Sequence, residues 1–523
     1  MRVMLFYAPY PGQKFRDEEN TISPVRTRNP KSALATLVAG ARQRLRIDGI
    51  EVEFSIIDTQ IVDGEPQYYA SFAYGPRTMD CYRYGAPFET YDDAVSQADI
   101  IGISNNFTNS ARVVTNFARH LRAVNPAALL IGGGMDMTAR PDWYLAHGQF
   151  DLVIQLEGEE PLARIVKAKA TGTPLEDVLK LRRGTSGGAV VLPGPQIDLD
   201  SSEPMAIDLV SRADEYDDTG EGTPPPSVLP PYTCFETSRG CYRTCSFCAT
   251  PMRGHYRYMS PAAVRRHLEH YRSAGISNLL FQEDNVLSRI QRSSRGTLLH
   301  RSGREDVLEI FHAARELGFS WEFANGLEIG KFLDLGFVDE ELMDAVFWNS
   351  ETDGRWAGCY RVQLSLEYLG DDPKKKFMKL RSFQEQREII ITMLRRGVRY
   401  QTFNVLIGHD EDDAARINLY RDRCLELKEE IMATAPDAVP YFNVFNRTIL
   451  PGTADFRSHA HRLEFDIEKT PEVISVYLSP MGSNHLSYYE LFQHRIRLNE
   501  AINGSLIDQY DGIYRHPTQA SVS

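Results

Sequence analysis

The first 185 residues alternate short apolar runs with stretches of helical periodicity. Two of these stretches, 32–45 and 110–124, repeat apolar residues every three or four positions, which predicts amphipathic helices. The apolar runs around them predict buried strands at 2–8, 52–57, 99–104, 128–134 and 151–156. Because strands separated by helices form parallel sheets with both faces covered, residues 1–185 are predicted to be a Rossmann-like, doubly wound α/β domain.

A second alternating region follows a segment rich in proline and glycine. This segment, 186–230, runs into the sequence GTPPPSVLPP, a composition that resists packing and is typical of a linker. Six further strands are predicted, most of them preceded by helices, at 232–238, 278–284, 320–325, 361–367, 399–408 and 439–446. Their order predicts a partial (β/α)6 barrel over 231–456, with its chemistry at the carboxyl ends of the strands. Residues 457–523 are predicted to form a small helical C-terminal extension.

Charge and cysteine content narrow the classes of function. The net charge is -13, which argues against a large nucleic-acid surface because such surfaces are basic. No apolar run is long enough to cross a membrane as a helix, and no signal-peptide pattern begins the chain. We therefore expect a cytoplasmic protein without nucleic-acid or membrane partners. Seven cysteines, three of them crowded together, suit a metal or redox site better than a disulfide framework.

The segment TSRGCYRTCSFCAT at 237–250 carries the crowded cysteines. Cys241, Cys245 and Cys248 have the spacing C-x3-C-x2-C directly after a predicted strand. Three thiolates on one tight loop can each hold one iron of a [4Fe-4S] cluster and leave the fourth iron open. A structural zinc site needs a fourth ligand, for which Cys234 is the candidate. Cys234 lies within the predicted strand, however, so the sheet rather than the cysteine loop is expected to set the direction of its side chain. A zinc-stabilised binding protein without turnover is therefore the alternative from a different class.

The cysteine loop resembles that of the radical S-adenosylmethionine (SAM) superfamily. That loop is C-x3-C-x2-C with an aromatic residue before the last cysteine, a place that Phe247 fills. The resemblance implies that the methionine part of SAM binds the open iron and that a transferred electron cleaves SAM reductively. It also implies an electron donor such as flavodoxin or ferredoxin.

Three pairs of residues near the ends of predicted barrel strands resemble the family's contacts with SAM. In the family, the second-strand pair lies near the methionine amine, the fourth-strand pair near the methionine or ribose, and the fifth-strand pair against adenine. Here the three pairs are Glu283 and Asp284, Ser365 and Glu367, and Ile407 and Gly408. A helix N-cap is the alternative role for Asp284. Asp410 departs from the family, which commonly has proline at that position.

The amino-terminal domain resembles that of the cobalamin-binding class of radical SAM enzymes. The fragments that carry this resemblance are GISNNFTNS, LLIGGGMD and VIQLEGEEPL. It implies that Ser104, Gly132, Gly133 and Gly134 border the corrin. The D-x-H-x-x-G motif that supplies an axial histidine in cobalamin mutases is absent from the sequence, so histidine ligation of the cobalt is not expected. The alternative is a domain that keeps the fold but binds no corrin.

The two resemblances together imply a kind of chemistry. With cobalamin bound, the expected reaction is methyl transfer to an unactivated carbon, or phosphorus, of a small-molecule or natural-product substrate. The alternative keeps the radical initiation but replaces methylation with a rearrangement, a cyclisation or a ring contraction. Neither resemblance names the substrate.

Overall fold

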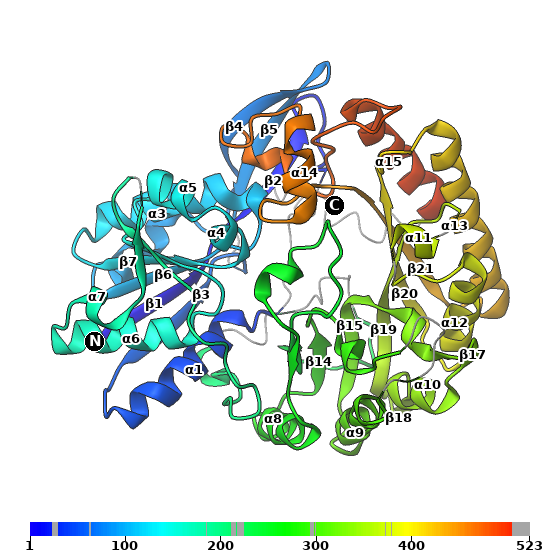
Figure 1. Ribbon diagram of the computed structural model, residues 1–523, viewed down its shortest axis with the longest axis horizontal. Coiled ribbons are helices and arrows are strands. Elements are labelled where there is room, and N and C mark those ends of the chain that lie inside the picture. The colour runs from blue at the N-terminus through cyan, green and yellow to red at the C-terminus, as the bar shows by residue number, and fades with distance from the viewer. Residues whose placement is uncertain are drawn as a thin grey trace.

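The computed structural model in Figure 1 describes residues 1–504 with internal gaps. The gaps fall at 23–29, 62–63, 185, 211–215, 217–223, 293–297, 299, 372 and 378, and the side chains of residues 374 and 375 are also not described. Residues 211–215 and 217–223 of the expected linker, and residues 505–523 of the expected C-terminal extension, thus lie outside the described residues.

The first sheet is parallel except at one edge. Its seven strands, in spatial order, are β3 (Glu53–Asp58), β1 (Arg2–Tyr7), β6 (Ile100–Ser104), β7 (Leu129–Gly133), β8 (Leu152–Ile154), β10 (Ala189–Val191) and β9 (Leu181–Arg183). Only β9 is antiparallel, to β10. All five strands expected in this region are present, and the doubly wound architecture is confirmed.

Helices cover both faces of this sheet (Figure 1). Val3 and Leu5 of β1 join the core formed with α1 and α6, whereas Met4 and Phe6 join the core formed with α3 and α5. Alternate residues of one strand thus enter opposite cores, as a strand buried on both faces requires. The helices here are α1 (Ala33–Ile47), α2 (Asp92–Val95), α3 (Ala111–Val124), α4 (Met135–Ala139), α5 (Pro141–Gly148), α6 (Glu159–Thr171) and α7 (Leu175–Val178).

Strand β10 lies inside the range 186–230 that the composition assigns to a linker. It pairs in parallel with β8, and Val190 and Val191 are fully buried there. The first sheet therefore extends past residue 185, and the linker begins later than expected. The run Ala189–Val191 is too short to signal a strand by its own periodicity, which is why the sequence does not reveal it.

The second sheet has six parallel strands in chain order. They are β11 (Tyr232–Phe235), β14 (Asn278–Phe281), β15 (Ser320–Leu327), β19 (Arg355–Glu367), β20 (Tyr400–Ile407) and β21 (Val439–Asn446). β18 (Asn349–Thr352) pairs antiparallel with β19, while β11 and β21 do not pair with each other. This is the expected partial barrel, open on one side.

Helices lie along the outer side of the barrel, and the cysteine loop lies on its inner side (Figure 1). The helices of this half are α8 (Pro261–Ser273), α9 (Ser302–Glu316), α10 (Glu340–Val346), α11 (Pro373–Lys376), α12 (Phe383–Arg395), α13 (Ala414–Thr434), α14 (Ala454–His459) and α15 (Tyr488–Asn503). α12 begins at Ser382 and α15 at Ser487, each with a capping box that satisfies free backbone N–H groups.

A small antiparallel sheet joins the first domain to the C-terminal extension. It consists of β2 (Tyr10–Phe15), β5 (Arg77–Tyr84) and β4 (Gln67–Tyr74), and β4 and β5 form a hairpin from a stretch, 68–84, that is rich in tyrosine. Tyr74 is fully buried and lies 5.3 Å, ring to ring, from Phe492 of α15. The extension is thus held against both halves of the chain.

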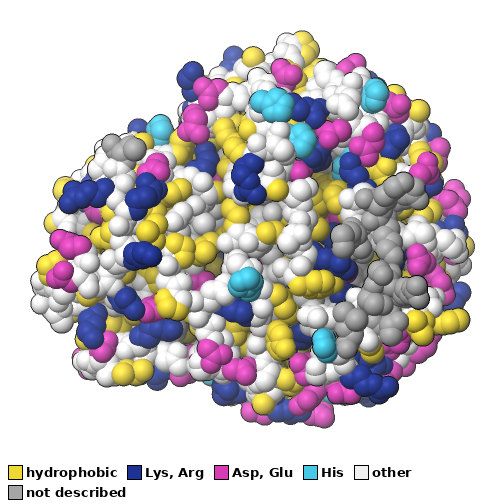
Figure 2. Space-filling view, viewed as in Figure 1, with side chains coloured by type: hydrophobic (Ala, Val, Ile, Leu, Met, Phe, Trp, Pro, Cys, Tyr) yellow, Lys and Arg dark blue, Asp and Glu magenta, His cyan; other side chains and the backbone are white. Residues whose placement is uncertain are grey.

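On the face drawn in Figure 2, Lys and Arg side chains are interspersed with Asp and Glu. The excess negative charge is therefore not gathered into one patch on that face. Among the described helices, none combines the length and apolarity needed to cross a membrane.

Candidate functional site

The three crowded cysteines lie on one loop at the carboxyl end of the barrel's first strand. The two short strands β12 (Ser238–Arg239) and β13 (Arg257–Tyr258) pair antiparallel and bracket this loop. The three thiols are half-buried. The backbone N–H of Arg243 points at Cys241 Sγ, and that of Thr250 at Cys248 Sγ, each at 3.4 Å. Such N–H groups favour thiolates and tune the potential of an iron–sulfur cluster.

The thiols of the loop do not form a single-ion site. Within the described ranges, no three His, Cys, Asp or Glu side chains converge on one ion position. A cubane cluster does not require that convergence, since each thiolate binds a different iron. Burial raises the pKa of Cys245 to about 11, and Lys379 opposes this by favouring the thiolate. The donor set therefore fits a cluster better than a lone zinc ion.

Cys234 is engaged elsewhere. Its side chain is buried within β11, where Sγ donates to the carbonyl of Pro30 at 2.8 Å and to Gln282 Oε1 at 3.0 Å. Burial raises the pKa of this thiol to about 12, which disfavours the thiolate that a metal requires. The geometry therefore gives no support to Cys234 as a fourth metal ligand.

Asp284 holds the cysteine loop at both of its ends. Its Oδ2 accepts from the backbone N–H of Gly240 at 2.8 Å and from Arg253 Nη1 at 2.9 Å, and its Oδ1 accepts from Thr250 Oγ1 at 2.8 Å. The N-cap of the following 3-10 helix is Asn285, not Asp284. In this structure the carboxylate of Asp284 is therefore occupied with fixing the loop.

Glu283 is buried behind the same loop. Its carboxylate accepts hydrogen bonds from the Thr237 N–H at 3.3 Å, from Thr237 Oγ1 at 2.9 Å and from Ser238 Oγ. Burial raises its pKa to about 7 against these hydrogen bonds. Glu283 thus supports the strand that leads into the cysteines.

Phe247 and Glu367 lie around Lys379, and Ser365 precedes Glu367 by two residues on β19. Lys379 Nζ donates to Glu367 Oε1 at 2.6 Å and lies 5.8 Å from the centre of the Phe247 ring. Glu367 has φ +51°, at a register shift between β19 and β20, and its buried Oε2 has no hydrogen-bond partner among the described residues. Ser365 Oγ packs so tightly on Gly326 that a Cβ there would lie 1.9 Å away. Strained backbone and an unsatisfied carboxylate oxygen are typical of ligand sites.

Ile407 and Gly408 differ in their surroundings. Ile407 is fully buried in the core, whereas Gly408 has φ +91° and begins a tight turn. The N–H groups of Gly408 and His409 both donate to Asp412 Oδ2, at 2.8 and 3.0 Å. The side chain of Ile407 thus lies in the core, and the turn at Gly408 is closed by Asp412.

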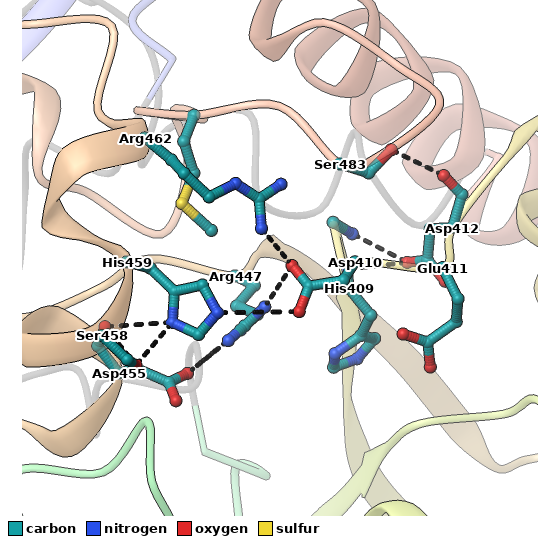
Figure 3. Close-up of polar contacts among 12 residues, drawn as sticks. His409, Asp410, Glu411, Asp412, Arg447, Asp455, Ser458, His459, Arg462 and Ser483 are labelled. Carbon is teal, nitrogen blue, oxygen red and sulfur yellow. Dashed lines mark hydrogen bonds and ion pairs between the residues drawn. The ribbon is translucent and has the colours of Figure 1, made fainter.

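Asp410, where the family commonly has proline, belongs to an ionic cluster (Figure 3). It accepts from Arg447 at 3.3 Å and from Arg462 at 2.5 Å. Arg447 also pairs with Asp455 at 2.6 Å, and the backbone N–H of Asp455 donates to the carbonyl of Ser246 in the cysteine loop. The departure from the family pattern thus serves to connect β20, β21 and α14 to that loop.

A cavity of about 700 Å³ lies between the carboxyl edge of the first sheet and the barrel. Ser104, Gly132, Gly133 and Gly134 line it from the first domain, and Gln282 and Asn325 are among the barrel residues that line it. Gly133 faces open space, because the nearest atom to an added Cβ is 3.9 Å away. An added Cβ would instead meet Met137 at Gly132 and Asn105 at Gly134, so packing explains these two glycines.

A buried ion-pair network crosses between the two domains beside this cavity. Arg239, two residues before Cys241, pairs with Glu157 at 3.3 Å, Glu159 at 2.8 Å and Glu236 at 2.8 Å, and only 9% of its side chain is exposed. Glu157 and Glu159 belong to the Gly-Glu-rich fragment of the first domain. No role for these side chains was predicted from the sequence. An arginine two residues before the first cysteine, together with two glutamates in a fragment of the first domain, is the sequence pattern that could have indicated this ion-pair network.

The two-domain architecture and the position of its cysteine loop define a class of fold: that of the cobalamin-dependent radical SAM enzymes. Solved structures that share this fold include those of TsrM and OxsB. TsrM from Kitasatospora setae, a radical SAM methyltransferase solved with a tryptophan substrate and a SAM analogue, has a TM-score of 0.55 at 14% identity, covering 87% of this chain and 74% of that one. OxsB, a cobalamin-dependent SAM radical enzyme solved with aqua-cobalamin and SAM, has a TM-score of 0.60 at 14% identity, covering 98% and 67%.

A second TsrM structure, with cobalamin and a [4Fe-4S] cluster bound, has a TM-score of 0.54 at 15% identity and covers 87% of this chain and 76% of that one. No protein-family model and no curated protein sequence matches the chain. At these identities the likeness establishes the fold alone, so the chemistry must be argued from the residues of this chain.

Proposed function

We propose that this protein is a cobalamin-dependent radical SAM enzyme and that its reaction is methyl transfer to an unactivated carbon, or phosphorus, of a small molecule. When bound, the cluster supplies an electron and an open iron for SAM, and cobalamin supplies a carrier for the methyl group. The observation that carries the proposal is the loop of three cysteines, whose flanking residues Arg239 and Arg253 line a cavity of about 700 Å³ together with the carboxyl edge of the Rossmann-like sheet.

The residues present fit each of these groups. Cys241, Cys245 and Cys248 would hold the cluster, while Asp284 fixes the backbone of the loop that carries them. The unsatisfied Oε2 of Glu367 offers an acceptor to the ammonium or ribose hydroxyls of SAM. On the opposite wall, Gly133 leaves room for a large flat ligand to approach the backbone.

The placement of the cavity also suits radical chemistry. The Arg239 network lines one side of the space between the domains, and limiting the access of water there protects reactive intermediates. A rearrangement or cyclisation is the second candidate, because the neighbours include OxsB, described as a radical enzyme, as well as the methyltransferase TsrM.

Anaerobic reconstitution tests the proposal. We expect about four irons and four sulfides per chain, a corrin absorption spectrum after loading with cobalamin, and 5'-deoxyadenosine on reduction with SAM present. S-adenosylhomocysteine together with a methylated product supports methyl transfer, whereas 5'-deoxyadenosine without either supports the second candidate. One tightly bound zinc without sulfide, or a complete cluster that leaves SAM intact under reduction, refutes the enzyme proposal.

A further inference from the structure

Three carboxamide side chains meet across adjacent strands of the barrel. Gln363 lies on β19, Asn404 on β20 and Asn443 on β21. Gln363 Nε2 donates to Asn404 Oδ1 at 3.2 Å, and Asn443 Nδ2 donates to the same oxygen at 3.3 Å. The three amides thus form a continuous row across the sheet, which we call the amide row.

The amide row faces the inside of the barrel. Along β20 and β21 the residues that flank Asn404 and Asn443 are fully buried, whereas these two asparagines are partly accessible. Because side chains alternate along a strand, the buried residues point to the outer helices seen in Figure 1 and the asparagines point inward. The row therefore lines the space that the cysteine loop also faces.

Three of the six amide nitrogen and oxygen atoms of the row take no part in its two hydrogen bonds. Since Asn404 Oδ1 accepts from both neighbours, the orientation of its amide is set, and its Nδ2 remains a free donor. Gln363 Oε1 and Asn443 Oδ1 remain acceptors. Within the described part of the chain these three atoms have no partner, and none of them is sealed from solvent. Donors and acceptors grouped in this way inside a barrel are what orients a polar ligand.

The charged groups on either side of the row are already paired. Arg361, two residues before Gln363 on the same face of β19, pairs with Glu322 at 3.2 Å, and both are buried. At the other end of the strand, Glu367 pairs with Lys379. Next to Gln363 the buried pair of Arg361 and Glu322 offers no free counter-charge to an anionic or cationic ligand, so the cost of desolvating that charge would be uncompensated. The row therefore favours a neutral group.

Apolar side chains continue the same inner surface toward the cysteines. Leu406 and Phe445 are register partners, partly accessible, and two residues further along their strands than Asn404 and Asn443. At about 3.3 Å per residue, they lie roughly 7 Å closer to the carboxyl edge. A ligand whose polar end sits on the row would thus present an apolar portion toward the cysteine loop.

We propose that the amide row is a substrate-recognition site for a neutral carboxamide or lactam-like group attached to an aromatic or apolar portion. This inference rests on the proposed function, because it takes the barrel interior as the substrate chamber. Asn404 donates to the carbonyl of the ligand, and the oxygens of Gln363 and Asn443 accept from its N–H groups. The carbon that reacts then belongs to the apolar portion, which lies nearest to the cysteine loop.

Nicotinamide and nicotinate are matched probes, since they share a ring and differ in an amide against a carboxylate. Binding to the reconstituted holoenzyme is measured by titration calorimetry for wild type, Asn404→Leu and Asn443→Leu. Asn418→Leu, which makes the same change on the exposed face of α13, is the control. The iron content and melting temperature of each variant report whether it is folded.

We expect nicotinamide to bind the wild type and the control alike, and nicotinate to bind at least about tenfold more weakly. Either inner variant should weaken nicotinamide about tenfold, the effect of losing one or two hydrogen bonds. Equal binding of the two probes, no effect of a folded inner variant, or no nicotinamide binding by a cluster-loaded protein overturns the proposal. A protein that binds nicotinamide through Asn404 but does not cleave SAM refutes the proposed function alone.

Discussion

Replacing Asp284 with asparagine should lower the retention of the iron–sulfur cluster and leave the affinity for SAM nearly unchanged. The substitution keeps the shape of the side chain and one acceptor oxygen, so Thr250 can still donate to it. The oxygen that accepts from the Gly240 N–H and from Arg253 becomes an NH₂ group. Arg253 is about a third exposed and contributes little, but the bond to Gly240 is sheltered, since only 13% of the Asp284 side chain is exposed.

The magnitude follows from that one sheltered, charge-assisted bond. Its loss costs about 1.5–3 kcal/mol, and the N–H of Gly240 then faces another donor. Cluster retention should therefore fall roughly ten- to a hundredfold, since 1.4 kcal/mol is about a factor of ten. The assay is iron and sulfide per chain after an anaerobic chelator challenge, with SAM affinity measured on the cluster-loaded fraction.

Asp422→Asn, an exposed carboxylate paired with Arg421 on α13, is the matched control and should retain iron like the wild type. We expect the Asp284 variant to lose iron while the loaded fraction binds SAM within about twofold of wild type. Full iron retention combined with weakened SAM binding would refute this reasoning. That result would restore the role that the family resemblance implies, a contact with the methionine amine.

Two further predictions concern the metal loop and the cavity. Alanine in place of Cys241, Cys245 or Cys248 should abolish iron binding and SAM cleavage, because each change removes a thiolate from a three-ligand site. The Cys234→Ala variant should keep nearly all the iron, since Cys234 contacts Pro30 and Gln282 instead. Equal iron loss in the Cys234 variant would contradict the conclusion that Cys234 is not a cluster ligand. Gly133→Val places a branched side chain in the cavity and should lower retention of the corrin about tenfold while the iron content stays unchanged. Corrin absorbance and an iron assay measure the two quantities. Undiminished corrin binding would show that the corrin does not bind at this edge of the first sheet.

The sequence predicts the framework of this protein well because most of its strands coincide with buried apolar runs. All six expected barrel strands form, although β19 begins six residues before its expected start, and the cysteine spacing points to the loop without help from tertiary structure. Periodicity fails to reveal strands that are short and whose burial depends on a partner strand far away in the sequence. β10 has three residues, and its burial is visible only beside β8.

The roles of individual site residues are less predictable, because they are set by contacts between distant segments. The carboxylates of Glu283 and Asp284 are adjacent in sequence and equally consistent with binding an ammonium group. In the structure both carboxylates accept hydrogen bonds from the protein backbone, Glu283 from Thr237 and Asp284 from Gly240. Nor does the substitution of Asp410 for a family proline signal an ion pair with Arg462, 52 residues later.

The Arg239 network bears on how the protein can be divided experimentally. In the intact chain this guanidinium is buried against two glutamates of the first domain. A barrel expressed alone would lose both of these ion pairs and keep only the one with Glu236. The lost contacts lie two residues from Cys241, so a truncated barrel should assemble its cluster less completely than the intact chain, even with all three cysteines present. The linker between the domains can be cut, but the ion pairs of Arg239 with Glu157 and Glu159 still hold the two domains together.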